Sequence, residues 1–259
     1  MPVNDNLGTR MKEFYEQVPK FRLYRRTPVA IRIDGKAFHT FTKGFEKPFD
    51  EVFSLSMRET MKYLCENIQG CLFGYTQSDE ITILLQDYKE VNTCSWFDYK
   101  VQKMVSVGAS MATFKFNERF SSNALHAVFG GKKHIYHNAL DRGAFFDARV
   151  FNVPFDDVVN NFIWRQQDAI RNAISAIGQA TYKHKELQGK STKDIIWMLE
   201  NDGNSIMNYP LKYLRGSACY KGVEERFSEY AGDFITRNVW KIDEEIPIFS
   251  EVRNFIPLM

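Results

Sequence analysis

The sequence predicts an α+β fold built around a ferredoxin-like sheet, and the order of its apolar patterns is the main reason. Over the first 155 residues, alternating and helical patterns follow one another as strand, helix, strand, strand, helix, strand. This βαββαβ order is the split β-α-β arrangement. The chain has 259 residues, 44% hydrophobic and 25% charged, which is typical of a globular protein.

The N-terminal part of the pattern contains a helix, a strand and a second helix. An amphipathic helix is predicted at 7–18 and an alternating strand at 29–34. The strand stops at Asp34-Gly35, a pair typical of turns. Asp50 is placed to cap the next helix, whose apolar face continues to about residue 68.

The remaining core elements are a hairpin, a helix and a fourth strand. Short strands at 71–76 and 81–85 enclose a polar turn, and a long helix covers about 95–115. The glycine-containing stretch 121–143 is predicted to be a mobile loop. An alternating strand at 145–151 completes the sheet core.

Beyond the fourth strand the pattern becomes mainly helical. Helices are predicted at 156–178 and 192–200, and the second begins with a capping-box-like Ser191-Thr-Lys-Asp. No linker-like stretch separates the two halves. We therefore interpret 1–155 as a core domain with an N-terminal helix, and 156–259 as a helical and mixed elaboration packed on that core in one compact unit.

Composition restricts the class of protein further. No apolar run approaches the roughly 20 residues that a membrane-spanning helix needs, and no signal-peptide pattern opens the chain, so we expect a cytoplasmic protein without a membrane partner. The total charge of +2 argues against a strongly basic nucleic-acid binder, but it is unevenly placed. Residues 20–47 carry eight Lys or Arg and two acids, whereas residues 224–259 carry four and eight.

Three carboxylates distant in sequence are expected to meet at one sheet edge. In a ferredoxin-like sheet the first and third strands are antiparallel neighbours, so Asp34 lies beside Asp79 and Glu80. Two such charges about 4 Å apart repel by roughly 4 kcal/mol unless a proton or cation lies between them. Oxygen ligands without His or Cys favour Mg²⁺. The alternative is that these are ordinary turn acids.

Features suited to phosphate surround this edge. Gly35 permits close backbone approach, and the amides from Gly35 to His39 are expected to wrap an anion. The basic and hydroxyl side chains that we group with this site are Lys36, Lys43, Lys47, Ser78, Lys100 and Lys103. Any one of these lysines is more simply interpreted as a solvated surface charge, and it is their clustering near the acids that indicates a phosphate site. An aromatic ring of Phe38-His39-Thr40-Phe41 is placed either to stack on a base or to enter the core.

Five strings together resemble the tRNA-histidine guanylyltransferase family and its bacterial and archaeal guanylyltransferase-like relatives. The strings are Ile31-Arg-Ile-Asp-Gly-Lys-Ala-Phe-His-Thr-Phe41, Lys47-Pro-Phe-Asp50, Tyr75-Thr-Gln-Ser-Asp-Glu80, Phe146-Asp-Ala-Arg-Val150 and Trp164-Arg-Gln-Gln-Asp168. The resemblance is densest over 28–85, continues to about 175 and is loose beyond.

The resemblance implies a polymerase- and cyclase-like palm as the catalytic core, and a nucleotidyltransferase that works in the 3′-to-5′ direction on tRNA. It implies that Asp34, Asp79 and the adjacent acid Glu80 are the catalytic residues, and that Asp34, Asp79 and the Gly35 carbonyl hold two Mg²⁺ ions. The positions implied for nucleotide binding are Asp34, Gly35, Lys36, Ala37, Phe38, His39, Lys47, Ser78 and Asp79, with Lys100 and Lys103 facing a second nucleotide.

The implied reaction has two steps at the 5′ end of tRNA and its acceptor stem. ATP or GTP first activates the 5′ phosphate, and the 3′-hydroxyl of an incoming nucleoside triphosphate then attacks it. The histidine-specific branch carries His-Ile-Asn-Asn two residues after the last aspartate of the Trp-Arg string, whereas here only Asn172 matches. That departure favours template-dependent repair of truncated tRNA over histidine-specific addition. A homotetramer is also implied.

Two other classes stay open at this point. A non-catalytic RNA-binding module shares the βαββαβ order, but it reads RNA with aromatic residues on the sheet face rather than with acids at strand ends. A primer-dependent 5′-to-3′ enzyme or a cyclase would share the palm.

Overall fold

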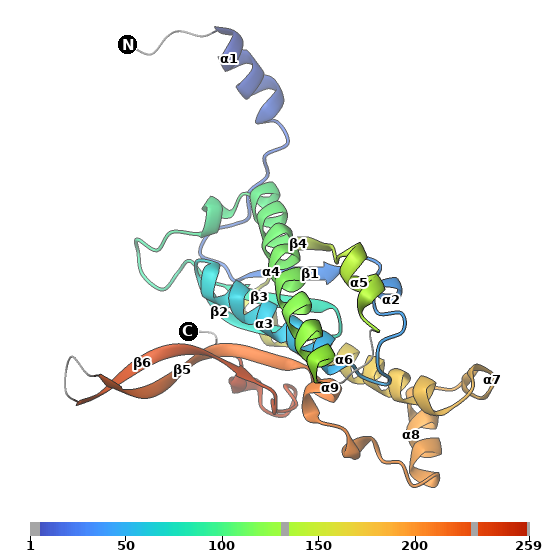
Figure 1. Cartoon of the computed structure of the whole chain (residues 1–259). Helices are drawn as coiled ribbons and strands as arrows, with labels where there is room; N and C mark the ends of the chain where they lie inside the picture. The colour runs from blue at the N-terminus through green and yellow to red at the C-terminus, as the bar shows by residue number, and fades with distance from the viewer. Residues whose placement is uncertain (1–5, 131–134, 229–232, 258–259) are drawn as a thin grey trace.

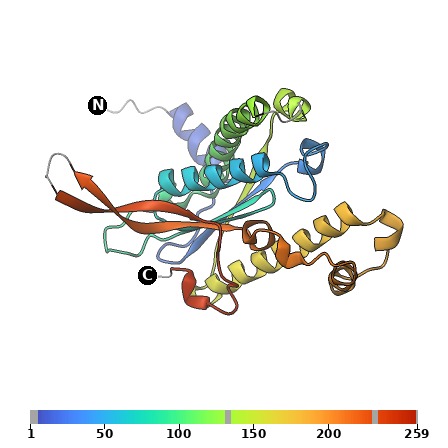
Figure 2. The same cartoon turned by 60° about the horizontal axis from the view of Figure 1, so that its bottom comes forward.

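The computed structural model describes residues 6–130, 135–228 and 233–257 as one six-stranded antiparallel sheet with helices on both faces (Figures 1 and 2). Within these ranges no helix is long and apolar enough to cross a membrane. The elements in chain order are α1 (Asn6–Met11), the π-helical η1 (Lys12–Glu16), β1 (Val29–Gly35), α2 (Phe38–Phe41), α3 (Glu51–Asn67), β2 (Cys71–Gln77), β3 (Glu80–Leu85), η2 (Trp96–Tyr99), α4 (Val101–Phe129), α5 (His137–Arg142), β4 (Phe146–Asn152), η3 (Phe155–Asp157), α6 (Val158–Thr181), α7 (His184–Leu187), α8 (Thr192–Asn201), η4 (Ile206–Asn208), α9 (Leu211–Arg215), β5 (Ser217–Ser228), β6 (Asp233–Asp243) and η5 (Arg253–Phe255).

The strand order confirms the ferredoxin-like prediction. The sheet runs β4-β1-β3-β2-β5-β6, and its first four members have the expected order with β1 and β3 in the centre. β1 pairs antiparallel with β3, and this register sets Asp34 opposite Glu80. On its other side β1 pairs with β4, which sets Asp34 opposite Asp147. The end of β1 therefore lies at the turn between β2 and β3.

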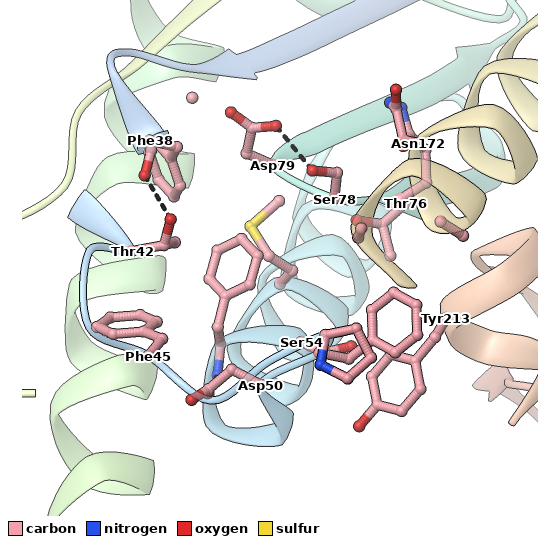
Figure 3. A pocket seen from close by; sticks show the side chains of 18 of the residues that line it. Phe38, Thr42, Phe45, Asp50, Ser54, Thr76, Ser78, Asp79, Asn172 and Tyr213 are labelled. Atoms are coloured by element: carbon pink, nitrogen blue, oxygen red, sulfur yellow. Dashed lines mark hydrogen bonds between the residues drawn. The ribbon is translucent and has the colours of Figure 1, made fainter. Parts of the chain in front are cut away.

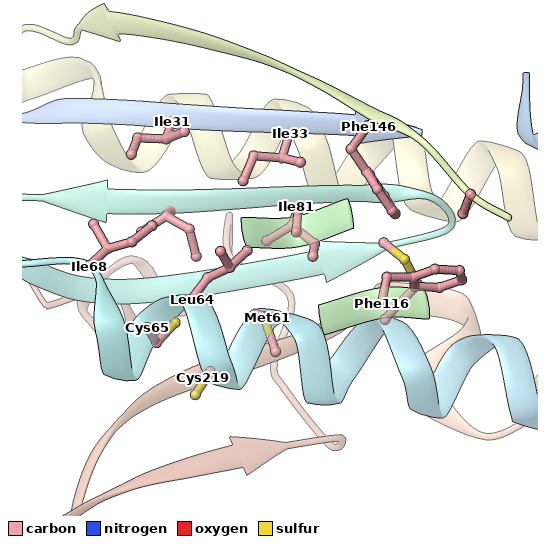
Figure 4. Close-up of a cluster of buried hydrophobic side chains, with 14 of the residues drawn as sticks. Ile31, Ile33, Met61, Leu64, Cys65, Ile68, Ile81, Phe116, Phe146 and Cys219 are labelled. Atoms are coloured by element: carbon pink, nitrogen blue, oxygen red, sulfur yellow. The ribbon is translucent and has the colours of Figure 1, made fainter. Parts of the chain in front are cut away.

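One face of the sheet packs against α3 and α4. Ile31, Ile33 and Ile81 on the central strands contact a cluster that includes Leu64 and Phe116 from these helices (Figure 4). The three isoleucines are fully buried, and burying one such side chain stabilises the fold by about 1.5–3 kcal/mol. Because side chains alternate along a strand, the intervening residues face the opposite side.

The opposite face packs against α6. Ala30, Tyr75 and Leu84 form a second buried cluster with Phe162 of α6 and Phe249 of the C-terminal segment. A third cluster joins α6 to the shorter helices α8 and α9. The helix α6 thus connects the sheet to the C-terminal elements that close the candidate site.

The structure corrects two boundaries of the core. The helix predicted at 95–115 begins as a 3₁₀ turn and then continues as α4 through Phe129. The apolar residues Phe116, Phe120 and Ala124 lie one turn apart and are buried, so the helical pattern extends into the predicted loop. The predicted mobile loop is therefore wrong for most of its length, because α5 follows; residues 131–134 lie outside the described ranges.

The C-terminal half contains two long strands as well as its helices. β5 and β6 form a hairpin, and β5 pairs with β2, so it extends the sheet of the core (Figure 2). The predicted helix at 7–18 forms as α1 and η1, which project from the body in Figure 1. Its apolar residues Leu7 and Phe14 are exposed rather than packed.

Candidate active site

A cavity of about 520 Å³ opens beside the turn between β2 and β3 (Figure 3). This volume lies within the range of small-molecule sites. Four parts of the chain form its walls, namely residues 35–58, the turn at 76–79, α6 and the segment from Lys212 to Ser217. Of the predicted site residues, the lining includes Gly35, Ala37, Phe38, His39, Lys47, Ser78 and Asp79.

The end of β1 is fastened directly to the acidic turn. The amide of Gly35 donates to the carbonyl of Asp79 over 3.1 Å, and Asp34 is the cross-strand partner of Glu80. Ser78 adopts a left-handed backbone conformation with φ of 49°. The predicted convergence of Asp34 with the 79–80 turn is therefore confirmed as geometry.

Asp79 is a carboxylate that burial has made costly to ionise. Desolvation is the main cause that raises its pKa above the ordinary value, and the nearby charge of Asp34 raises that pKa further. The hydroxyl of Ser78 donates to Asp79 Oδ1 over 3.1 Å and acts in the opposite direction, as does a backbone hydrogen bond (Figure 3). A nearby cation would offset the cost of ionising Asp79.

Asp34 is partly exposed. Its side chain is 39% exposed, and its nearest cation is the guanidinium of Arg149, 4.0 Å away. Arg149 is also 3.6 Å from Asp147 and is half exposed. Such an exposed pair contributes little to stability, so Asp34 keeps an oxygen available to a ligand.

Glu80 is held differently from the other two acids. Its carboxylate accepts a hydrogen bond of 2.8 Å from Arg165, and both side chains are almost fully buried. Burial raises the pKa of Glu80, and the charge of Arg165 opposes that rise. The three acids therefore meet at one sheet edge as predicted, but the carboxylate of Glu80 turns to α6. Across the described ranges, no group of three or more His, Cys, Asp or Glu residues has metal-binding geometry.

The turn that follows β1 offers fewer amides than expected. Gly35 donates its amide to Asp79, and Lys36 donates its own to the carbonyl of Phe145 over 2.8 Å. The candidates that remain for an anion are the amides of Ala37 to His39. Ala37 stands in the left-handed region with φ of 57°, where the chain reverses into α2.

The aromatic residues of this turn belong to the core. Phe38 and Phe41 are buried, and their ring centroids lie 5.0 Å apart. Phe38 also contacts the ring of Phe146 at 5.0 Å. Base stacking on this pair is therefore excluded, although Phe38 contributes to the cavity wall.

The predicted lysines do not gather at one place. Lys47 lines the cavity, whereas Lys36 is exposed and does not. Lys100 and Lys103 lie at the beginning of α4, where Lys100 pairs with Arg22 through a backbone bridge and Lys103 is 5.5 Å from the ring of Phe97. The expectation that they cluster with the acids of the same chain is wrong.

The length of α4 separates these two lysines from the acids. The helix reaches the acidic edge at Thr113, which accepts from the amide of Phe146 opposite Gly35, and at Asn117, which bonds the backbone of Ala144 just before β4. Thr113 is ten positions after Lys103, a separation of about 15 Å along the helix. The two lysines are therefore placed at the other end of the sheet, where β3 finishes.

Several lining residues belong to no motif or periodic pattern that marks this site in the sequence. Arg58 on α3 and Lys212 and Tyr213 on α9 border the cavity, and all three contact Glu51. Asn172 of α6 also borders it; the family resemblance marks this residue, but its spacing from the acids does not. A helix of five residues such as α9 has too little periodicity to be predicted.

The acids fit a divalent cation of the hard class. Asp34 and Asp79 present only oxygen donors, and the desolvated carboxylate of Asp79 lacks an ion-pair partner among the described residues. Mg²⁺ prefers such ligands and shares its remaining positions with phosphate oxygens and water. The donor set therefore suits Mg²⁺ together with a phosphorylated ligand.

A palm-like sheet with paired acids at the ends of its central strands, beside a cavity bordered by a turn and a lysine, is an arrangement that suits a nucleotidyltransferase. Residues 8–154 match the family model described as tRNAHis guanylyltransferase. The chain therefore belongs to the tRNAHis guanylyltransferase family.

Solved structures and a curated relative agree with this assignment. A bacterial tRNA(His) guanylyltransferase-like protein in complex with ATP is 39% identical, with a TM-score of 0.80 and 97% of each chain covered. A complex of such a protein with GTP is 38% identical, with a TM-score of 0.76 and the same coverage. A probable tRNA(His) guanylyltransferase of Dictyostelium discoideum is 24% identical over 92% of this chain and 93% of its own.

Proposed function

We propose that this protein is a 3′-to-5′ nucleotidyltransferase that adds nucleotides to the 5′ end of tRNA, with truncated tRNA as its substrate for repair. The observation that carries the proposal is that Asp79 lines a nucleotide-sized cavity, while Asp34, which does not line it, lies beside the same turn as the cross-strand partner of Glu80. The complexes of bacterial relatives with ATP and GTP support nucleoside triphosphates as ligands of this cavity.

The chain's own residues divide the work of binding between them. Ala37, Phe38 and His39 offer backbone amides to the triphosphate, and Lys47 offers a charge on the same wall. Ser78 orients the carboxylate of Asp79 by its hydrogen bond. The buried Arg165–Glu80 pair fixes the start of β3, so that Asp79 stays beside Asp34.

Asp34, Asp79 and the carbonyl of Gly35 would hold Mg²⁺. When bound, the ions supply an acid that stabilises charge on the phosphate oxygens. The side chains contribute by positioning the reacting groups, because phosphoryl transfer needs mainly positioning and electrostatic stabilisation.

The reaction consists of two displacements at phosphorus. A 5′-phosphate oxygen of the RNA first attacks the α-phosphorus of ATP or GTP, and pyrophosphate leaves. The 3′-hydroxyl of an incoming nucleoside triphosphate then attacks the 5′ phosphorus, and the nucleoside monophosphate leaves. Both displacements can use one pair of acids, because each places charge on oxygens around a single phosphorus.

Histidine-specific addition of guanosine is the second candidate. It is favoured by the names of the curated relatives. Against it stands the segment after Asp168, where only Asn172 matches the histidine-specific string. Asn172 borders the cavity, so it is available to nucleotide as well as to RNA.

Sequencing of the products tests both candidates. The enzyme is incubated with ATP, GTP and Mg²⁺ and with either a 5′-truncated tRNA or a full-length tRNA-histidine, and the added nucleotides are read. Templated addition to several truncated tRNAs supports repair. One guanosine restricted to tRNA-histidine supports the second candidate, and extension at 3′ ends alone contradicts both.

Two substitutions connect the reaction to the site. Asp34→Ala and Asp79→Ala are expected to lower the rate of addition by at least 1,000-fold, on the order of the ~4 kcal/mol attributed to one electrostatic group. Circular dichroism and the melting temperature Tm serve as controls for folding. A near-normal rate from either folded variant would place the chemistry elsewhere.

A further inference from the structure

Two aromatic side chains stack on each other in the wall of the cavity. The ring centroids of Phe49 and Tyr213 lie 4.6 Å apart, and their planes differ by 3°. Both residues line the cavity, and Figure 3 shows Tyr213 across it from Thr42 and Phe45. Phe49 precedes α3, whereas Tyr213 comes from α9, outside the segment 8–154 that matches the family model.

A single carboxylate fixes the ring of Tyr213. The Tyr213 hydroxyl donates to one oxygen of Glu51, and Lys212 donates to the other over 3.0 Å. Arg58, which is 2% exposed, adds a contact of 2.7 Å to Glu51. Lys212 and Arg58 also pair with Glu244, which follows β6, at 3.1 and 2.8 Å.

This network leaves the aromatic wall without excess charge. Two acids and two bases balance one another, so the wall offers no net attraction to a triphosphate. The described charges that are left for phosphate lie on the side of Lys47 and the turn from Ala37 to His39. An occupant with a charged end and a flat end would therefore place its flat end at Phe49 and Tyr213.

We propose that the Phe49–Tyr213 pair is the wall on which the base of the activating nucleotide packs, and that it selects purines over pyrimidines for the first of the two displacements. The proposal rests on the proposed function, in that the cavity is taken to bind a nucleoside triphosphate. Stacking grows with ring overlap and does not depend on exocyclic groups. The pair therefore accepts adenine and guanine alike, which matches the ATP and GTP of the related complexes. Glu51 acts as a positioning residue for Tyr213.

Dissociation constants for five probes test the proposal in the full-length protein. The probes are ATP, GTP, CTP, UTP and inorganic tripolyphosphate, which lacks a base. The variants are Tyr213→Leu, Phe49→Leu, Tyr213→Phe and Glu51→Gln. The matched control is Tyr182→Phe, since Tyr182 also donates its hydroxyl to a carboxylate, that of Asp202 at 2.7 Å, but does not line the cavity.

The wild-type protein is expected to bind ATP and GTP more tightly than CTP and UTP. Each leucine variant should weaken ATP and GTP binding by about tenfold or more and leave tripolyphosphate within twofold. Glu51→Gln should lower the purine preference by a smaller factor, and Glu51→Asp should restore part of it. Tyr213→Phe keeps the stacked rings but loses the hydrogen bond to Glu51, so it should lower the purine preference less than Tyr213→Leu does, and it keeps the test valid if a leucine variant unfolds.

The outcomes separate the two proposals. If the wild-type protein binds neither nucleotides nor tripolyphosphate, the proposed function fails. If it binds them but the leucine variants keep the wild-type purine preference, or lose tripolyphosphate as strongly as ATP, then the aromatic wall does not select the base and this inference alone is overturned.

Discussion

Asp34 and Glu80 are direct cross-strand partners at the edge of the sheet, yet only Glu80 has a close ion-pair partner. Arg165 of α6 lies 2.8 Å from Glu80, whereas the nearest cation to Asp34 is 4.0 Å away. The difference follows from α6, which covers the start of β3 and leaves the end of β1 open. One acid of the pair is therefore neutralised by a cation within the protein, and the other keeps an oxygen available to a ligand.

Breaking the buried pair should cost stability. Arg165→Met leaves the Glu80 carboxylate buried without a cation, and such a loss costs about 3–5 kcal/mol. In the double variant with Glu80→Gln the buried charge is gone, so a large part of that stability should return. Urea unfolding of the two single variants and the double variant measures this coupling. Equal destabilisation in the single Arg165 variant and in the double variant would show that the charge of Glu80 is irrelevant.

The sheet and its acidic edge could be predicted because they depend on local patterns and topology. Alternation placed Val29 to Ile33 in a strand, and the order of elements placed Asp34 beside the turn containing Asp79. These conclusions need only the period of a strand and the antiparallel neighbours of a ferredoxin-like sheet. The register between β1 and β3 agrees with them.

The parts that could not be predicted depend on long-range packing. Glu80 occurs beside Asp79 in the sequence, but its partner Arg165 comes from 85 residues later. Lys103 shares the basic character of Lys47, but only its place on a 29-residue helix removes it from the cavity. The wall formed by Tyr213 depends on α9, which is too short to leave a pattern. The homotetramer stays a prediction.

Asp79→Asn should separate stability from activity. The ionised carboxylate is disfavoured by burial and by Asp34, so its neutral replacement should raise Tm at pH 7 by a few degrees while nucleotide addition is lost. Each 1 kcal/mol corresponds to roughly 2–4 °C in a chain of this size.

The pH dependence of that difference has a definite sign. The folded-state pKa of Asp79 is raised above the ordinary value of 3.8. The ionised carboxylate therefore lowers the free energy of unfolding by its full amount at pH values above the folded-state pKa. This loss of stability disappears as the pH falls below the pKa of Asp79 in the unfolded chain. The gap in Tm between wild type and Asp79→Asn should thus narrow from pH 7 toward pH 4. Mg²⁺ at pH 7 should narrow it as well. A gap that is independent of both pH and Mg²⁺ would contradict the assignment.

Lys47 and Lys103 should differ in their effect on nucleotide affinity. Lys47→Ala removes a charge from the cavity wall and is expected to weaken ATP binding by about tenfold, as for a lost charge-assisted contact of ~1.5 kcal/mol. Lys103→Ala should leave ATP binding at this cavity within twofold, because Lys103 lies near Phe97 instead. Calorimetric titration with Mg²⁺ and ATP distinguishes the two variants, and similar losses would mean that α4 joins the cavity in solution.

Gly35→Ala tests the close packing at the end of β1. A Cβ atom at Gly35 would lie 2.3 Å from the ring of Phe38, whereas one at Gly108 of α4 would meet only ordinary contacts at 3.9 Å. Because Phe38 is buried in the core, the added Cβ atom must displace the turn that carries Ala37 to His39. We expect the free energy of unfolding to fall by about 1–3 kcal/mol and ATP binding to weaken at least tenfold. Gly108→Ala is the matched control, and it should stabilise the helix by up to about 1 kcal/mol. Unchanged ATP affinity in a folded Gly35→Ala protein would show that this turn does not bind the triphosphate.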